Sequence, residues 1–336
     1  MLDRRAPAEA NRRPAFTEAS ALSPADKSDA AAVPPGAVPQ AHTHERAAFW
    51  LGTALMVFSA CCFGFITTLS RLAYDSGGTP VTQVFLRFVA FVVLIGPLIA
   101  MLRRPLLLPR RGLVGAMGIA VLMLMMSAGY LFAVAYIPVS LGAMIFYTFP
   151  LMVGVLSAAM GRERMTVVKA VALAGAFAGL ALALGPSFTG LDPRGVALAL
   201  TAAVGVTLTT LYGVRAMAGH DGLTFNFWTN AWMLVLASAY VLAAGGLAWP
   251  DSAAGGIAAV LATLAYVVAF ITWFAGLKLI APTYGAMMLN VEPVVSILAA
   301  TLLLGERLGA LQIAGVVLVL GMLTLMAASG RRGKRH

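Results

Sequence analysis

A single acidic residue, Glu292, lies in the middle of a long apolar stretch and is followed directly by Pro293. A charged carboxylate at the centre of a bilayer is unfavourable by about 2.5–3.5 kcal/mol on insertion scales, so an acid in such a stretch is a candidate functional group. It could bind an ammonium group or exchange a proton. The alternative is a protonated or hydrogen-bonded structural Glu that fills the gap beside the proline.

Asn290 is the second polar residue of this stretch. It lies two positions before Glu292, which corresponds to about 200° around a helix, so the two side chains cannot both face one cavity squarely. Which of the two faces a cavity stays open at this point.

Arg87 is the only other charged residue well inside an apolar stretch, about six residues from its outer end. Its long side chain can reach toward the membrane interface. Contact with a carboxylate of a bound molecule and a structural role, bonded to carbonyl groups at a helix end, are equally good readings.

Aromatic and amide side chains recur at helical spacing in the other apolar stretches. They could line a cavity for an apolar or aromatic molecule, although packing within the bundle is the commoner fate of such residues. We expect Asn230, with Asn226 one turn earlier, to face inward, and Trp228 and Trp232 to face lipid or the interface. The candidates are Tyr130, Tyr147, Tyr266, Trp273 and Asn230, with Phe270 between the last two aromatics.

Pro150 and Pro293 lie near the middle of two apolar stretches. A proline cannot donate to the carbonyl four residues earlier, so we expect the carbonyls of Phe146 and Leu289 to be free. In a membrane such a carbonyl is tolerated best where it faces protein or a watery cavity. The sequence therefore predicts a hinge at each proline, with an ordinary kink as the alternative.

The elements that must hold these residues are membrane-spanning helices. The chain is 60% hydrophobic and 11% charged with mean hydropathy +0.90, which excludes a water-soluble globular protein. The apolar stretches are continuous, not alternating, so they predict helices of about 20 residues and exclude a membrane β-barrel. The fold class is an all-α polytopic membrane protein with ten spans, predicted at 49–72, 81–102, 113–134, 139–160, 165–185, 194–215, 224–247, 254–277, 282–304 and 309–328.

Basic residues are distributed unequally over the loops. Thirteen lie in the breaks and the tail on one side of the membrane and three on the other. The positive-inside rule then puts both termini in the cytoplasm. Residues 1–47 are rich in Ala and Pro and predict a disordered cytosolic tail, and residues 330–336 a basic one. The excess of Arg over Lys is typical of a GC-rich bacterial source, and thus of an inner membrane.

A segment of the chain is duplicated. Residues 137–164 return at 280–307 with one offset of 143, which aligns Pro150 with Pro293 and Glu163-Arg164 with Glu306-Arg307. Five spans separate the copies, and because five is odd the second copy must be inverted in the membrane. Inverted repeats are a recurrent architecture of secondary transporters. We expect one repeat at 48–186 and the other at 187–329.

With these motifs the chain resembles a ten-helix EamA-type member of the drug/metabolite transporter superfamily, over about residues 49–328. The resemblance rests on Arg87-Phe88, Tyr147-Thr148-Phe149-Pro150, Glu292-Pro293 and the two Glu-Arg pairs, together with ten spans and the duplication. It implies export or exchange of small metabolites such as amino acids, through a central cavity lined by spans one to four and six to nine. Spans five and ten would be peripheral. We expect Gly175 and Gly179 of span five to form a small-residue notch that packs within the bundle.

The leading functional hypothesis is a secondary transporter that is not an enzyme and needs no cofactor or metal. No Gly-x4-Gly-Lys-Ser/Thr loop is present in the sequence, which argues against direct ATP drive. A passive channel is the first alternative. An intramembrane enzyme is less favoured, because no His or Asp lies in any predicted span. The expected partners are a small-molecule substrate and membrane lipid but no nucleic acid, and the protein would be a monomer or a homodimer.

Overall fold

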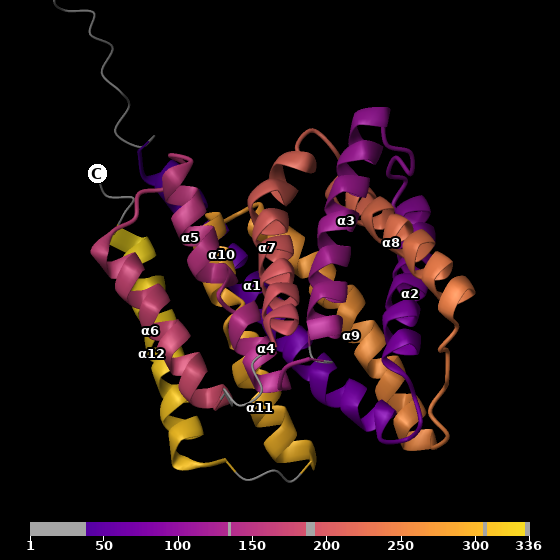
Figure 1. Ribbon diagram of the computed structural model, residues 1–336. Coiled ribbons are helices and arrows are strands. Elements are labelled where there is room, and N and C mark those ends of the chain that lie inside the picture. Colours follow the sequence, from indigo (N-terminus) through magenta and orange to yellow (C-terminus); the bar gives the residue numbers. More distant parts are fainter. Residues whose placement is uncertain (1–37, 134–135, 186–191, 305–307, 333–336) are drawn as a thin grey trace, which may run out of the picture. The chain divides into compact units, whose positions relative to one another are not determined.

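The computed structural model describes residues 38–133, 136–185, 192–304 and 308–332 (Figure 1). Every regular element in these residues is an α-helix. The twelve helices are α1 Val38–Tyr74, α2 Pro80–Met101, α3 Arg110–Ala133, α4 Val139–Phe146, α5 Phe149–Ala159, α6 Val167–Leu184, α7 Pro193–Ala216, α8 Gly222–Ala244, α9 Ala253–Leu277, α10 Pro282–Met288, α11 Val291–Leu304 and α12 Ala310–Arg332.

Ten segments within the described residues are long and apolar enough to cross a membrane, which confirms the predicted number. Their ends differ from the predicted ones by a few residues, because caps and loops decide where each helix stops. Span four consists of α4 and α5, and span nine of α10 and α11, so each of these two spans is a broken helix. The protein is a polytopic membrane protein of two inverted five-helix repeats.

The prediction for the N-terminal tail was wrong over part of its length. Residues Glu45–His336 form one compact unit and Met1–His44 another. Helix α1 begins at Val38, so residues 38–47 are helical and not disordered. The good helix formers Glu45, Arg46, Ala47 and Ala48 extend the first span in this direction. The predicted disorder of residues 1–37 and the last four residues of the basic tail lie outside the described residues.

The two repeats make equivalent contacts. A Cβ atom added to Gly52 would lie 2.7 Å from Cγ2 of Ile280, and one added to Gly195 would lie 2.7 Å from Cγ2 of Ile137. Both members of the second pair are 143 residues removed from their counterparts in the first. The start of each repeat's first span therefore accepts the same loop isoleucine from the other half, and only glycine leaves room for it.

Spans five and ten pack against each other along their length, at one edge of the bundle (Figure 1). Their backbones approach closely: a Cβ on Gly179 would lie 2.9 Å from the Gly315 carbonyl oxygen, and one on Gly175 would lie 2.6 Å from Sδ of Met322. The notch of span five thus packs within the bundle, as predicted. Small residues permit such contact in lipid, where dispersion forces rather than the hydrophobic effect hold helices together.

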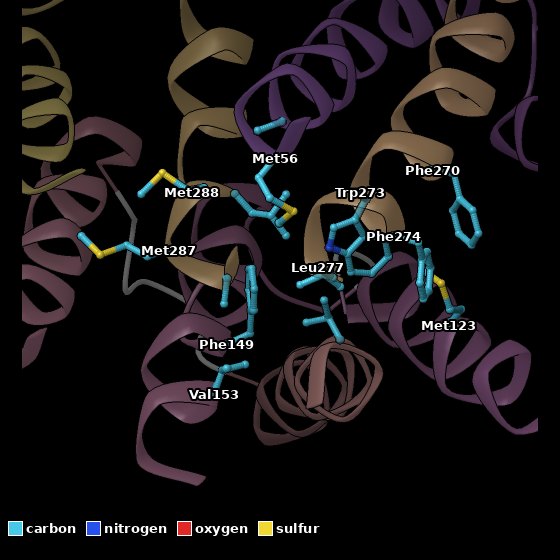
Figure 2. Close-up of a cluster of buried hydrophobic side chains, with 14 of the residues drawn as sticks. Met56, Met123, Phe149, Val153, Phe270, Trp273, Phe274, Leu277, Met287 and Met288 are labelled. Atoms are coloured by element: carbon cyan, nitrogen blue, oxygen red, sulfur yellow. The ribbon is translucent and has the colours of Figure 1, made fainter. Parts of the chain in front are cut away.

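The interior is one apolar cluster that draws side chains from both repeats (Figure 2). Methionine and aromatic side chains dominate the part that the figure shows, and flexible Met side chains fill the irregular gaps that rigid rings leave. The residues are Met56, Met123, Phe149 and Val153 of the first repeat, with Phe270, Trp273, Phe274, Leu277, Met287 and Met288 of the second.

Candidate functional site

The two broken spans stop and restart at equivalent places. In span four the helix ends at Phe146, turns through Tyr147 and Thr148, and restarts with Pro150 in the first turn of α5. In span nine it ends at Met288 and restarts at Val291. A proline in a first helical turn removes an N–H that has no partner in the helix anyway. Each proline therefore begins a second half-helix and does not merely bend a continuous one, while the hinge function stays a prediction.

The expectation of a free Leu289 carbonyl was wrong. The backbone N–H of Glu292 donates to the Leu289 oxygen at 3.0 Å, and the Asn290 N–H donates to the Met287 oxygen at 3.0 Å. The chain tightens into three-residue turns across the break, and these turns satisfy carbonyls that a continuous helix with an internal proline would leave open.

Glu292 is partly exposed, and its carboxyl group accepts a hydrogen bond from the Tyr147 hydroxyl. Tyr147 follows α4 directly and Glu292 is in the first turn of α11, so this bond joins the break of one repeat to the break of the other. The Phe146 ring lies between Tyr147 and Tyr130, with centroids 5.2 and 5.6 Å away. Tyr130 is close enough to interact electrostatically with Glu292. The acid therefore faces an aromatic wall built by the first repeat.

Arg87 lies on the other side of this acid, within range for an electrostatic interaction with Glu292. Its guanidinium carbon is 5.7 Å from the centroid of the Tyr266 ring, a cation–π contact. Nη2 donates to the Ser70 hydroxyl at 3.3 Å, and Nε is buried without a hydrogen-bond partner among the described residues. The predicted bond from Arg87 to helix-end carbonyls is thus replaced by contacts to side chains, and one donor stays unused.

Tyr266 links this arginine to span seven. Its hydroxyl donates to Oδ1 of Asn230 at 3.0 Å, and Nδ2 of Asn230 donates to the Asn226 carbonyl at 3.0 Å. Both asparagines are buried, which confirms their predicted inward orientation. Trp228, on the opposite face, is half-buried and donates from Nε1 to the Leu106 carbonyl in the loop after α2 at 2.8 Å.

Two of the predicted residues lie deeper. Asn290 is 3% exposed within the break itself, so of the two polar residues of span nine it is Glu292 that reaches the Tyr147 and Arg87 cluster. Trp273 is buried edge-to-face against Phe63 and Phe270, with ring centroids 6.3 and 6.1 Å apart. Within the described residues no group of three or more His, Cys, Asp or Glu is arranged to hold a metal ion.

The EamA-like transporter family model matches the chain twice, over residues 50–185 and 193–328. The chain belongs to this family. Both matches are offset by 143 residues at each end, the offset of the internal duplication. The protein is therefore a membrane transporter whose two halves are both EamA-like units.

Relatives of the transporter carry equally general names. An "Uncharacterized transporter" of Archaeoglobus fulgidus is 27% identical over 221 residues, which are 63% of this chain and 75% of that protein. The "Uncharacterized transporter YvbV" of Bacillus subtilis is 27% identical over 206 residues, 59% of this chain and 66% of that protein. One crystal structure of a protein superimposes with a TM-score of 0.70 over 84% of this chain and 98% of its own, at 18% identity. This last likeness concerns the fold alone.

The offset of 143 also relates the site residues of the transporter to one another. It pairs Arg87 with Asn230, Tyr130 with Trp273 and Tyr147 with Asn290. Six of the eight predicted residues are thus three pairs that the inverted repeat carries to both halves of the site. Glu292 has Phe149 as its counterpart, so the acid occurs in one repeat only.

The same offset identifies a residue that the sequence analysis did not count as part of the site. Gln83 is the counterpart of Asn226 and lies one turn before Arg87. It is 2% exposed, and its Nε2 donates to the Ala259 carbonyl at 3.2 Å and to Oγ1 of Thr263 at 3.0 Å. Extending the duplication to spans two and seven would have found it, and it fixes the helix that carries Arg87 against span eight.

Proposed function

We propose that this transporter is a secondary carrier that exports or exchanges a small organic metabolite, an amino acid or a related compound, by alternating access. The observation that carries the proposal is the hydrogen bond from Tyr147 to Glu292, because it joins the two helix breaks across the repeat interface. In inverted-repeat carriers, substrate and coupling-ion sites lie at this interface and are formed by discontinuous helices. A ligand that replaces either partner of the bond changes how the breaks hold together.

Glu292 is the group that we assign to an ammonium or a proton. A carboxylate at this depth needs a positive partner or a proton, and the Tyr147 hydroxyl satisfies only part of its acceptor capacity. A substrate ammonium or a proton would complete it. Because each binds the ionised carboxylate, the two compete, and such competition is what couples a proton gradient to substrate movement.

Arg87 is the group that we assign to a substrate carboxylate. Its Nε–H is buried and unused, and its guanidinium is held over Tyr266, which in turn is bonded to Asn230. Guanidinium groups bind carboxylates with two parallel hydrogen bonds. An amino acid would place its two charged groups between Arg87 and Glu292.

The proposed location is the inner membrane of a bacterium, with both termini in the cytoplasm. The support is the excess of basic residues in the loops on one side of the ten spans. In this orientation Arg104, Arg162 and Lys169 face the cytoplasm, and a substrate released on the other side is exported.

A two-step experiment tests the function. The metabolites in the medium of cells that produce or lack the transporter are compared, and the compound that accumulates is then used as a radiolabelled probe with purified transporter in liposomes. Liposomes preloaded with the unlabelled compound are expected to take up the label transiently above its equilibrium level. Equilibration without this overshoot would indicate a passive channel, and conversion of the compound without any gradient would indicate an enzyme.

A further inference from the structure

Some contacts between the repeats occur twice, once at each end of the bundle. Oγ1 of Thr82 donates to the Ala248 carbonyl at 2.9 Å, and Oγ1 of Thr224 donates to the Pro105 carbonyl at 2.7 Å. Ala248 and Pro105 are repeat counterparts, 143 residues apart. These bonds fix the loops after α2 and α8 in the same way at both ends, so they do not distinguish one end of the bundle from the other.

One contact occurs only once. Helices α5 and α10, which are half-helices of spans four and nine, pack against each other. Their repeat counterparts are α11 and α4, and these two are not packed in this way within the described parts of the chain. Two repeats of one design thus meet closely at one end of the broken spans and not at the other. This inequality is what a carrier closed at a single end requires.

Glu163 lies at the closed end, in the loop that follows α5. Its Oε1 accepts the backbone N–H of Thr283 at 3.1 Å, and its Oε2 pairs with Nζ of Lys169 at 2.9 Å. The Glu163 side chain is only 10% exposed. Thr283 is the second residue of α10, where backbone N–H groups have no partner inside the helix. The carboxylate therefore ties the first turn of α10 to spans four and five by a charge-assisted hydrogen bond.

The residue before it holds the same loop from another direction. Nη1 of Arg162 donates to the Leu211 carbonyl at 2.8 Å, and its guanidinium carbon is 5.1 Å from the centroid of the Tyr212 ring. Leu211 and Tyr212 belong to α7, the first span of the second repeat. The Arg162-Glu163 pair thus attaches one short loop to two helices of the opposite repeat, α7 and α10.

The geometry points to Glu163 as a latch: a positioning residue that keeps the bundle closed between α5 and α10 while the other end of the broken spans is not closed. Because α10 leads directly into the break at Asn290, release of the Glu163 bond frees the half-helix that ends beside Glu292. This inference rests on the proposed alternating-access function and assigns the residue that stabilises one of its two states.

Two reporter cysteines test the latch, in a chain whose native Cys61 and Cys62 are replaced by alanine. Ser157→Cys places a thiol on α5, one turn after Gly154, whose added Cβ would lie 3.4 Å from Cγ2 of Thr283. Ser157 is buried at 0% exposure. Ser140→Cys places a second thiol at the start of α4, on the partly exposed opposite end. Each is labelled with a membrane-impermeant maleimide in vesicles of both orientations.

Glu163→Ala is expected to raise the labelling rate of Ser157→Cys about tenfold or more, the effect of losing a charge-assisted hydrogen bond from the closed state. The same substitution is expected to lower labelling of Ser140→Cys, because opening one end closes the other. An unchanged rate at Ser157→Cys would overturn the latch. A rise there without a fall at Ser140→Cys would support the latch but contradict alternating access, so the two failures are distinguishable.

Lys169→Met is the matched control. It removes the ion pair with Oε2 but leaves the bond from Thr283 to Oε1, so labelling is expected to stay within about twofold of the parent. A tenfold rise in this variant would overturn the assignment to the Thr283 bond. Size-exclusion profiles establish that each variant is folded. If Glu163→Ala does not fold, Glu163→Gln decides the question: its amide oxygen can still accept the N–H but lacks the charge, and no increase in labelling would overturn the latch.

Discussion

Spans four and nine occupy equivalent places in the two repeats, and both interrupt their helix just before a proline, at Tyr147-Thr148 and at Leu289-Asn290. The residues around the two interruptions are chemically different. The first carries Phe149 where the second carries Glu292, and Tyr147 where the second carries Asn290. The shared backbone comes from the shared proline, whereas the chemistry does not repeat. One repeat supplies an acid, and the other supplies the hydroxyl and the aromatic wall that face it.

The acid of the second break gives the strongest test of this comparison. Glu292→Gln keeps the shape of the side chain and removes its charge and its exchangeable proton. Transport in the liposome assay is expected to fall at least about 100-fold, because the ligand of the proposed site is lost. Phe149→Leu, at the equivalent position of the first break, is the matched control and is expected to retain most of the activity. Unchanged flux in Glu292→Gln would remove this residue from the mechanism.

The hydroxyl of the first break gives a smaller effect. Tyr147→Phe keeps the ring beside Phe146 but removes the donor to Glu292. The initial rate of transport is expected to fall about tenfold, as for the loss of one hydrogen bond to a charged group. Tyr130→Phe removes a hydroxyl from the same aromatic wall but not the one that bonds Glu292, so its effect should be smaller. Equal effects of the two variants would contradict a specific bond between the breaks.

Much of the fold could be predicted from the sequence, because lipid imposes a simple rule on it. Each span must be about 20 apolar residues long and satisfy its own backbone, so hydropathy and punctuation by Pro and Gly were sufficient for ten spans. The offset of 143 and an odd number of intervening spans gave the inverted repeat. The predicted tail boundary failed, because residues 38–47 lack an apolar pattern but contain good helix formers.

The site could be predicted only in part. Polar residues deep in the spans pointed to Glu292, Arg87 and Asn230, since such residues are rare in lipid. The helical periodicity of span nine did not decide between Glu292 and Asn290, because the helix breaks between them and the angle of 100° per residue does not carry through. The bond from Tyr147 to Glu292 joins residues 145 positions apart, and only the folded structure brings them together.

The close approach of α1 to the second break gives a third test. A Cβ on Gly64 would lie 2.6 Å from the Glu292 carbonyl oxygen, so Gly64→Ala must push α1 away from α11. We expect a loss of about 1–3 kcal/mol, seen as a lower melting temperature in detergent, and severalfold slower transport. The repeat counterpart is Thr207, whose Oγ1 bonds the Ala203 carbonyl of its own helix at 2.7 Å. Thr207→Ala is therefore expected to be tolerated, and equal melting temperatures for the two alanine variants would contradict the difference.

The smallest expected effect concerns a charge that one end of the bundle has and the other lacks. Asp221 begins α8, and Nη1 of Arg104 donates to its Oδ2 at 2.5 Å; the repeat counterpart of Asp221 is Gly78. Burial raises the pKa of Asp221, but hydrogen bonds from Thr224 and from Arg104 outweigh it and hold the pKa below its usual range.

Because the pKa is lowered in the folded state, the Asp221 carboxylate contributes stability above the unfolded pKa of about 4, and this contribution is lost as the pH falls through the folded value. Half of the Arg104 side chain is exposed, so screening limits the contribution to less than about 1 kcal/mol. Asp221→Asn keeps the helix cap and removes only the charge. Its melting temperature should lie at most about 2 °C below the parent at pH 7, and the two should converge near pH 3. A difference that persists at low pH would assign the effect to the cap and not to the charge, and the two ends of the bundle would then differ in shape alone.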